Sequence, residues 1–194
     1  MRCLITCLLL TVLIPAMGQS YQPGFLLTSS LDTVRGSIRF SGKSSTPSPC
    51  QFRTDKKAQP REVFPGTIHG FCTGNGAYYF SRSIGMSEDV FVEVLVKGYV
   101  NLFKFGDIFF VEKSDSAFFE LSNDTEVLLV EGQQRRQSSH NYSRMLGLLT
   151  ADCPDVSKQA YTVPLKEKQL VRLVADYNRC KGSSSNLYRI KYKR

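Results

Sequence analysis

The stretch DVFVEVLVKGYVNLFKFGDIFFVEKSDSAFFELS, residues 89–122, decides the fold. Every second residue from 90 to 96 is Val, and this alternation with a period of two predicts a half-buried β-strand. Gly98 interrupts the pattern, which resumes from Tyr99 to Phe105, and Gly106-Asp107 suits a tight turn before a further apolar run. Regularly spaced turn signals with no helical stretch between them predict an antiparallel β-meander.

The segment before this meander is also β in character. GFLLTSSLDTVRGSIRF, residues 24–40, has two apolar runs on either side of Ser29–Asp32 and predicts a hairpin. CQFRT, residues 50–54, predicts a short strand. GTIHGFCTGNGAYYFSRSI, residues 66–84, predicts two strands joined at Asn75-Gly76, because both positions tolerate a positive φ. After the meander, TEVLLVEG is a candidate last strand.

Two amphipathic helices are predicted to follow the sheet. SHNYSRMLGLLTADC, residues 139–153, carries an apolar stripe at helical spacing that ends in Cys153. PLKEKQLVRLVADYNRC, residues 164–180, carries a second stripe that ends in Cys180, and Gly182 suits a helix end. The predicted fold class is therefore α+β, with an antiparallel β-meander sheet packed against a C-terminal disulfide-linked helical hairpin.

Four cysteines follow the first twenty residues, and an even number in an exported chain favours disulfides. We expect Cys153 to pair with Cys180, each in the last turn of its helix, which stabilises the fold by about 3–4 kcal/mol. Cys50 and Cys72 are then expected to pair within the β region, with buried thiols as the alternative. The sequence contains no CxxC pattern, so we expect no metal and no cofactor.

The first residues, MRCLITCLLLTVLIPAMGQS, have the pattern of a signal peptide. Arg2 supplies a positive start, and the apolar run from Leu4 to Ile14 is too short to span a bilayer. We expect cleavage after Gly18, with an uncleaved membrane anchor as the alternative. The predicted organisation is a signal peptide over 1–18, a single β-rich domain with C-terminal helices over 19–182, and a basic tail over 183–194.

The formal net charge of +8 is concentrated at the C-terminus. The basic residues of the predicted tail are Arg189, Lys191, Lys193 and Arg194. A nucleic-acid-binding protein is expected to carry its basic residues on a face of the folded body, so we expect no nucleic-acid partner. The tail is instead predicted to lie near anionic lipid or an acidic partner.

Catalytic patterns are weak in this sequence. No GxSxG elbow occurs, and His69 and His140 show no relation to a nucleophile. The acidic residues Glu93, Glu112 and Glu120 could form a glycosidase pair if they share a face, but exposed positions of a half-buried sheet give the same pattern. We therefore expect a protein that is not an enzyme.

Aromatic residues are frequent in the predicted strands. Runs such as YYF and IFF place aromatic rings on both faces of a strand, so one face is core and the other is either covered by the helices or exposed. The candidate contact surface consists of Tyr78, Tyr79, Tyr99, Phe103 and Phe109.

Four segments in a fixed order resemble a known domain: PGFLLTSSLDTVRGSIRF, FVEVLVKGYVNLFKFGDIFFVEK, YSRMLGLLTADC and LVRLVADYNRCKG. Together they resemble an uncharacterised exported domain of Bacteroidota-type bacteria, often found N-terminal to an outer-membrane β-barrel. The resemblance implies a place in the periplasm or at the periphery of the outer membrane. In such relatives the chain continues beyond the tail, so we expect a stand-alone module, a barrel on another chain, or a barrel missing from this open reading frame.

These observations predict a non-catalytic envelope module that binds a protein or another envelope component. The resemblance implies an outer-membrane β-barrel or another envelope protein as partner, and the basic tail and aromatic strands add anionic lipid or glycan. A small-ligand or glycan-binding domain that uses an aromatic sheet face is the alternative, and a hydrolase is the less favoured one.

Overall fold

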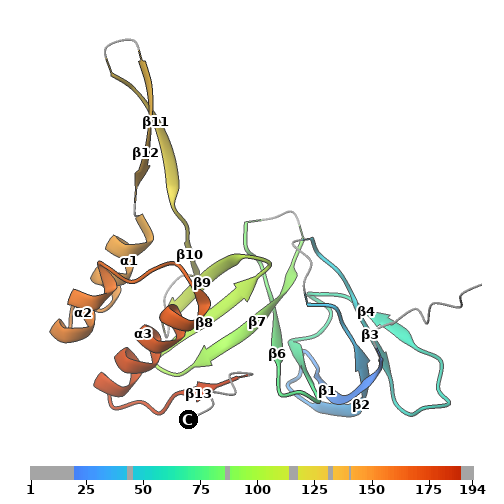
Figure 1. Ribbon diagram of the computed structural model, residues 1–194. Helices are drawn as coiled ribbons and strands as arrows, with labels where there is room; N and C mark the ends of the chain where they lie inside the picture. The colour runs from blue at the N-terminus through green and yellow to red at the C-terminus, as the bar shows by residue number, and fades with distance from the viewer. Residues whose placement is uncertain are drawn as a thin grey trace, which may run out of the picture.

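A computed structural model describes residues 20–42, 46–85, 88–113, 118–130, 133–139 and 141–188 (Figure 1). Its main sheet contains β1 (Gln22–Leu27), β2 (Thr33–Arg39), β3 (Cys50–Arg53), β4 (Arg61–Val63), β5 (Gly70–Thr73), β6 (Tyr78–Arg82), β7 (Val90–Lys97), β8 (Val100–Phe105), β9 (Ile108–Lys113), β10 (Phe118–Leu121) and the short β13 (Asn186–Leu187). The helices are α1 (Asn141–Leu149), α2 (Pro154–Ala160) and α3 (Glu167–Cys180). A separate hairpin consists of β11 (Asp124–Val130) and β12 (Gln133–Ser139).

The sheet is antiparallel, and its strands follow the order β10-β9-β8-β7-β6-β5-β1-β2-β3-β4, with β13 paired to β7. The predicted α+β class and the meander are confirmed. The turn at Asn75-Gly76 joins β5 to β6, and Gly76 has φ +84°. Sequence order is broken once, because β5 pairs with β1 rather than with β4. The hairpin β1–β2 therefore lies between β5 and β3.

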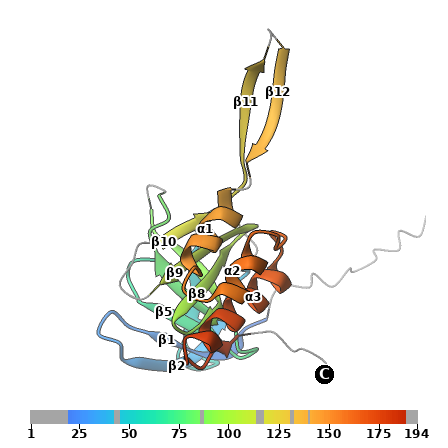
Figure 2. The ribbon, with the colours of Figure 1, turned by 90° about the vertical axis from the view of Figure 1, so that its left-hand side faces the viewer.

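The helical region differs from the prediction. Three helices are present in the described residues rather than two, because the chain turns after α1 and starts again at Pro154. Cys153 is the N-cap residue of α2 and is not in the last turn of a helix. The segment before the helices also forms a two-stranded sheet, β11–β12, which projects away from the main sheet in Figures 1 and 2.

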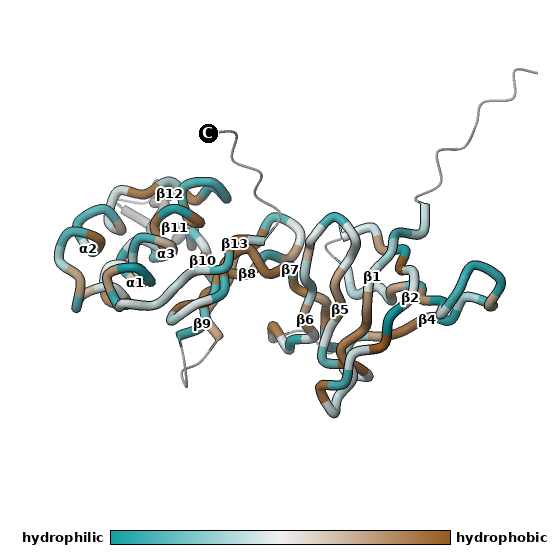
Figure 3. The backbone as a smooth tube through the Cα atoms, turned by 90° about the horizontal axis from the view of Figure 1, so that it is seen from below, coloured by the Kyte–Doolittle hydropathy of each residue, from teal (hydrophilic) through white to brown (hydrophobic). Residues whose placement is uncertain are grey.

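Three apolar clusters stabilise the fold. The largest fills the space between the helices and one face of β7–β10, and it includes Leu102, Val111 and Tyr177. The second lies on the same side of β1–β6 and includes Phe52 and Phe71. The third occupies the opposite face of β7–β9, where none of the described helices packs (Figure 1). Apolar colour accordingly concentrates along β7 and β8 in Figure 3.

A buried asparagine fixes α3 to the β7–β8 turn. The Asn178 amide donates to the Val100 carbonyl at 3.0 Å, and its Oδ1 accepts from the Val100 N–H at 2.7 Å. A Cβ atom at Gly98 would lie 2.4 Å from Asn178 Nδ2, so the glycine that breaks the strand pattern is required by this close approach. The contact joins residues 78 positions apart and holds the helix in register with the sheet.

Within the described ranges, no helix combines the length and the apolar character needed to cross a bilayer. The predicted signal peptide, residues 1–18, lies outside the described residues.

Candidate functional site

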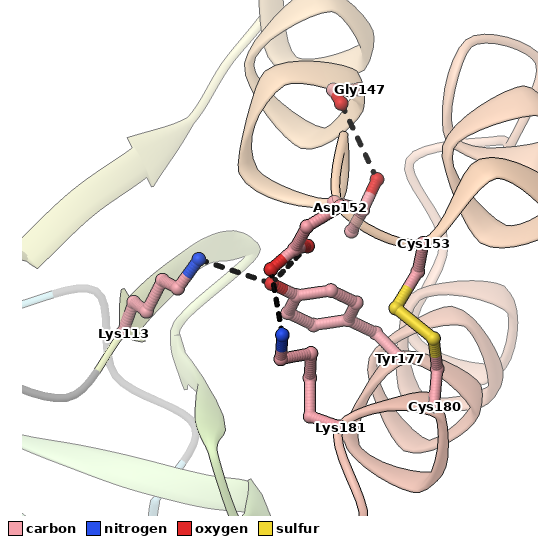
Figure 4. Close-up of a disulfide and its surroundings, with 8 residues drawn as sticks. Lys113, Gly147, Asp152, Cys153, Tyr177, Cys180 and Lys181 are labelled. Carbon is pink, nitrogen blue, oxygen red and sulfur yellow. Dashed lines mark hydrogen bonds and ion pairs between the residues drawn. A yellow bond between two sulfur atoms is a disulfide. The ribbon is translucent and has the colours of Figure 1, made fainter.

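The predicted Cys153–Cys180 disulfide is present and joins the start of α2 to the end of α3 (Figure 4). Its Cα atoms are 6.4 Å apart, within the usual range for a disulfide. Cys153 is buried, whereas Cys180 is exposed at the helix end. The bond therefore covers one end of the largest apolar cluster.

A polar network runs beside the disulfide (Figure 4). Tyr177 donates its hydroxyl to Asp152 Oδ1 at 2.8 Å and accepts a hydrogen bond from Lys113 Nζ at 3.0 Å. Lys181 Nζ lies 2.9 Å from Asp152 Oδ2. Asp152 and Lys181 are the direct neighbours of Cys153 and Cys180, so the ion pair runs parallel to the S–S bond.

Hydrogen bonding within this network, together with burial, shifts the pKa values of Asp152, Tyr177 and Lys181. The hydrogen bond from Lys181 is the main cause that holds the pKa of Asp152 below its ordinary value, and the Tyr177 hydroxyl adds to it. The same hydrogen bond raises the pKa of Lys181. Burial is the main cause that raises the pKa of Tyr177. All three groups keep their neutral-pH charge state, which maintains the Asp152–Lys181 ion pair.

The expected pairing of Cys50 with Cys72 is wrong. Both are buried free thiols. Cys50 belongs to β3 and Cys72 to β5, and β1 and β2 lie between them in the sheet, which separates them by roughly 14 Å at about 4.8 Å per strand. They also face opposite sides, because Phe52 and Phe71 lie in the same cluster on one side, so Cys72 points to the other. Burial raises the pKa of Cys50 to about 12, so this thiol is unreactive at neutral pH.

The five aromatic residues predicted as a contact surface do not form one. Tyr79, Phe103 and Phe109 are buried, each in a different apolar cluster. Tyr99 is half-buried beside Tyr177, with ring centroids 6.0 Å apart. The prediction failed because alternation identifies the two faces of a strand but does not show which of them is covered.

Tyr78 belongs instead to an aromatic row on the face of the sheet opposite helices α1–α3. Its ring lies 4.5 Å from Tyr188 and 5.9 Å from Phe25 between centroids, and Phe80 follows on the same strand. These four rings are half-buried. Two cations flank the row, with Lys97 Nζ 5.4 Å and Arg82 Cζ 5.6 Å from the Phe80 ring centroid. We call Phe25, Tyr78, Phe80, Arg82, Lys97 and Tyr188 the aromatic–basic strip.

A groove lies on the other side of β13, against α3. It has a volume of about 550 Å³ and is lined by Lys168, Val171, Arg172, Ala175, Asp176, Arg179 and Leu187. Leu187 is an exposed apolar side chain in its wall, and three cationic side chains face one carboxylate. Asp176 pairs with Arg179 at 2.8 Å and with Arg172 at 3.9 Å. The lining of the groove therefore combines apolar side chains with three cations and one carboxylate.

The predicted basic tail and the two histidines are only partly within the described residues. The charged residues of the predicted tail, Arg189, Lys191, Lys193 and Arg194, lie outside the described residues. The described start of that tail is part of the fold, because β13 pairs with β7. His140 also lies outside, and His69 packs on Phe80 with ring centroids 5.1 Å apart.

The three candidate carboxylates do not come together as an acid pair. Glu93 is buried on the helix side of the sheet, paired across strands with Lys104, whereas Glu112 and Glu120 lie on the other face. Glu112 forms an ion pair with Arg82 at 3.7 Å. Among the described residues, no group of three or more His, Cys, Asp or Glu side chains could hold a metal ion.

No family model, curated protein or solved structure matches this chain.

Proposed function

We propose that the protein is an exported, non-catalytic binding module that attaches to the anionic surface of the bacterial envelope. The resemblance to a Bacteroidota-type exported domain supports this compartment, and the Cys153–Cys180 bond supports an oxidising environment. On the same grounds we propose the periplasm or the periphery of the outer membrane as its location, with an outer-membrane β-barrel or another envelope protein as its neighbour.

The observation that carries the proposal is the groove between α3 and β13. Its lining combines the cations Lys168, Arg172 and Arg179 with apolar side chains, which is the combination that the head group and acyl chains of an anionic lipid match. Residues 189–194 continue from the same end of the chain and add four basic residues with no acidic one. The sequence that follows β13 therefore adds basic residues to those that line the groove.

Vesicle binding tests the proposal. The mature protein is expected to co-sediment with phosphatidylglycerol-containing vesicles and not with pure phosphatidylcholine, with binding weakened by salt. Arg172→Glu with Arg179→Glu is expected to weaken binding at least tenfold. Deletion of 189–194, which leaves β13 in place, is expected to weaken it several-fold.

The matched control changes net charge equally elsewhere. Arg144→Glu with Lys158→Glu alters two exposed cations on α1 and α2. If this variant loses as much binding as the groove variant, the attraction is a general charge effect and the groove has no special role. Failure of the wild-type protein to bind anionic vesicles would remove the lipid as its ligand.

A further inference from the structure

The aromatic–basic strip lies on the face of the sheet opposite the helices. Tyr78 and Phe80 project from β6, where they pair with Val94 and Val92 of β7. The valines are fully buried, whereas the rings above them are only half-buried. The rings therefore form the outer layer of the third apolar cluster, and none of the described helices lies over them (Figure 1).

The rings are held in fixed positions. Gly70 lies directly across from Phe80, and a Cβ atom there would be 2.7 Å from Phe80 Cδ1, so the absence of a side chain lets the ring lie against β5. Tyr188 is fixed by its backbone N–H, which donates to the Leu95 carbonyl at 3.2 Å, and its ring contacts Tyr78. Because these rings are already ordered, a flat apolar ligand that packs on them loses little free energy to the ordering of side chains.

The strip also has a positive potential. Among the described residues, no carboxylate lies within ion-pair range of Lys97, and Glu112 is the partner of Arg82. The pKa of His69 is lowered mainly by burial and further by the positive charges of Arg82 and Lys97. The two cations lie 5.4 Å and 5.6 Å from the centroid of the Phe80 ring, so an anionic group near this ring is attracted by both.

We propose that the aromatic–basic strip binds an acidic glycan, with sugar rings packed against the Tyr78–Tyr188 ring pair and their carboxylate or phosphate groups held by Lys97 and Arg82, which the Phe80 ring positions. A pyranose presents an apolar face of C–H groups that can pack on an aromatic ring, and its acidic substituent can pair with the cations that lie over the neighbouring Phe80 ring. Leu187 faces the α3 groove and Tyr188 faces the strip, so the two surfaces lie on opposite sides of β13. This inference therefore does not depend on lipid binding.

Calorimetric titration with an oligogalacturonate and its carboxyl-reduced, uncharged counterpart tests the proposal. The acidic oligosaccharide is expected to bind at least tenfold more tightly than the neutral one. Phe80→Leu is expected to weaken binding at least tenfold, and Lys97→Gln several-fold, with the thermal midpoint of each variant measured to show that it folds. The groove variant with Arg172→Glu and Arg179→Glu is expected to bind the glycan normally.

Tyr161→Leu and Lys158→Gln are the matched controls, because they alter an exposed ring and an exposed cation on the helical side. Equal binding of the two oligosaccharides, no binding, or equal losses in strip and control variants would overturn the proposal. Self-association of the wild-type protein that Phe80→Leu abolishes would also overturn it, because the strip would then be an interface between copies.

Discussion

The two halves of the molecule enclose their cores in different ways. In the N-terminal half, β1–β6 surround an apolar cluster without any described helix, and two buried cysteines remain thiols. In the C-terminal half, three helices cover β7–β10, and a disulfide and a polar network hold their ends. The covalent bond joins the start of α2 to the end of α3 at the border of the largest apolar cluster.

The largest difference between the halves is expected from removing their cysteines. Cys153→Ser with Cys180→Ser should lower the free energy of unfolding by about 3–4 kcal/mol, because the unfolded chain loses its loop constraint. Hydrogen exchange should show the loss of protection mainly in α2 and α3.

Cys50→Ala with Cys72→Ala is the control in the other half. Each substitution removes only a small buried side chain, so the pair should lower the free energy of unfolding by roughly 1–2 kcal/mol in total. Equal losses in the two double variants would remove the distinction between a covalently held half and a packed half.

The next effect concerns the contact that links the helices to the sheet. Asn178→Ala should lower the free energy of unfolding by about 2–3 kcal/mol, because the buried N–H and C=O of Val100 lose their partner. Asn186→Ala, at an exposed asparagine of β13, should change it by less than about 0.5 kcal/mol. A denaturant titration measures both, and a neutral Asn178→Ala would show that water replaces the amide.

The smallest effect is a pH dependence confined to the C-terminal half. The folded-state pKa of Asp152 is depressed, so its ion pair stabilises the fold above the ordinary Asp pKa of about 3.9 and is lost as the pH falls below it. Asp152→Asn should therefore reduce the difference between the thermal midpoints at pH 6 and pH 3. An unchanged difference would assign acid sensitivity to other carboxylates.

Much of the fold follows from local sequence patterns. The alternating valines of β7 predict a strand, and the helical stripe of α3 predicts a helix. The strand was expected to be half-buried, but both of its faces are buried from Val90 to Val96, because apolar clusters cover each side. Helix α2 was missed because it is short and buries only Val156 and Ala160. Asn178 was missed because a polar residue in a helix is ordinarily exposed, and its partner is remote in sequence.

The candidate surfaces depend on strand order, which local patterns do not reveal. Placing β1–β2 between β5 and β3 separates Cys50 from Cys72 and prevents their pairing. The same order, together with the position of the helices, decides that Tyr78 is partly exposed while Tyr79 is buried. Because both faces of the sheet carry aromatic rings, the sequence predicted aromatic strands but did not show which face is partly exposed.

Thiol counting with disulfide mapping tests the central claim most directly. The purified mature protein should show no thiol reactive with an aromatic disulfide reagent when folded and two when unfolded without reductant. Proteolysis should release one linked pair of peptides, containing Cys153 and Cys180. Four thiols in the unfolded protein, or a linked pair containing Cys50 and Cys72, would contradict the account of a covalently held helical half beside a packed thiol-containing one.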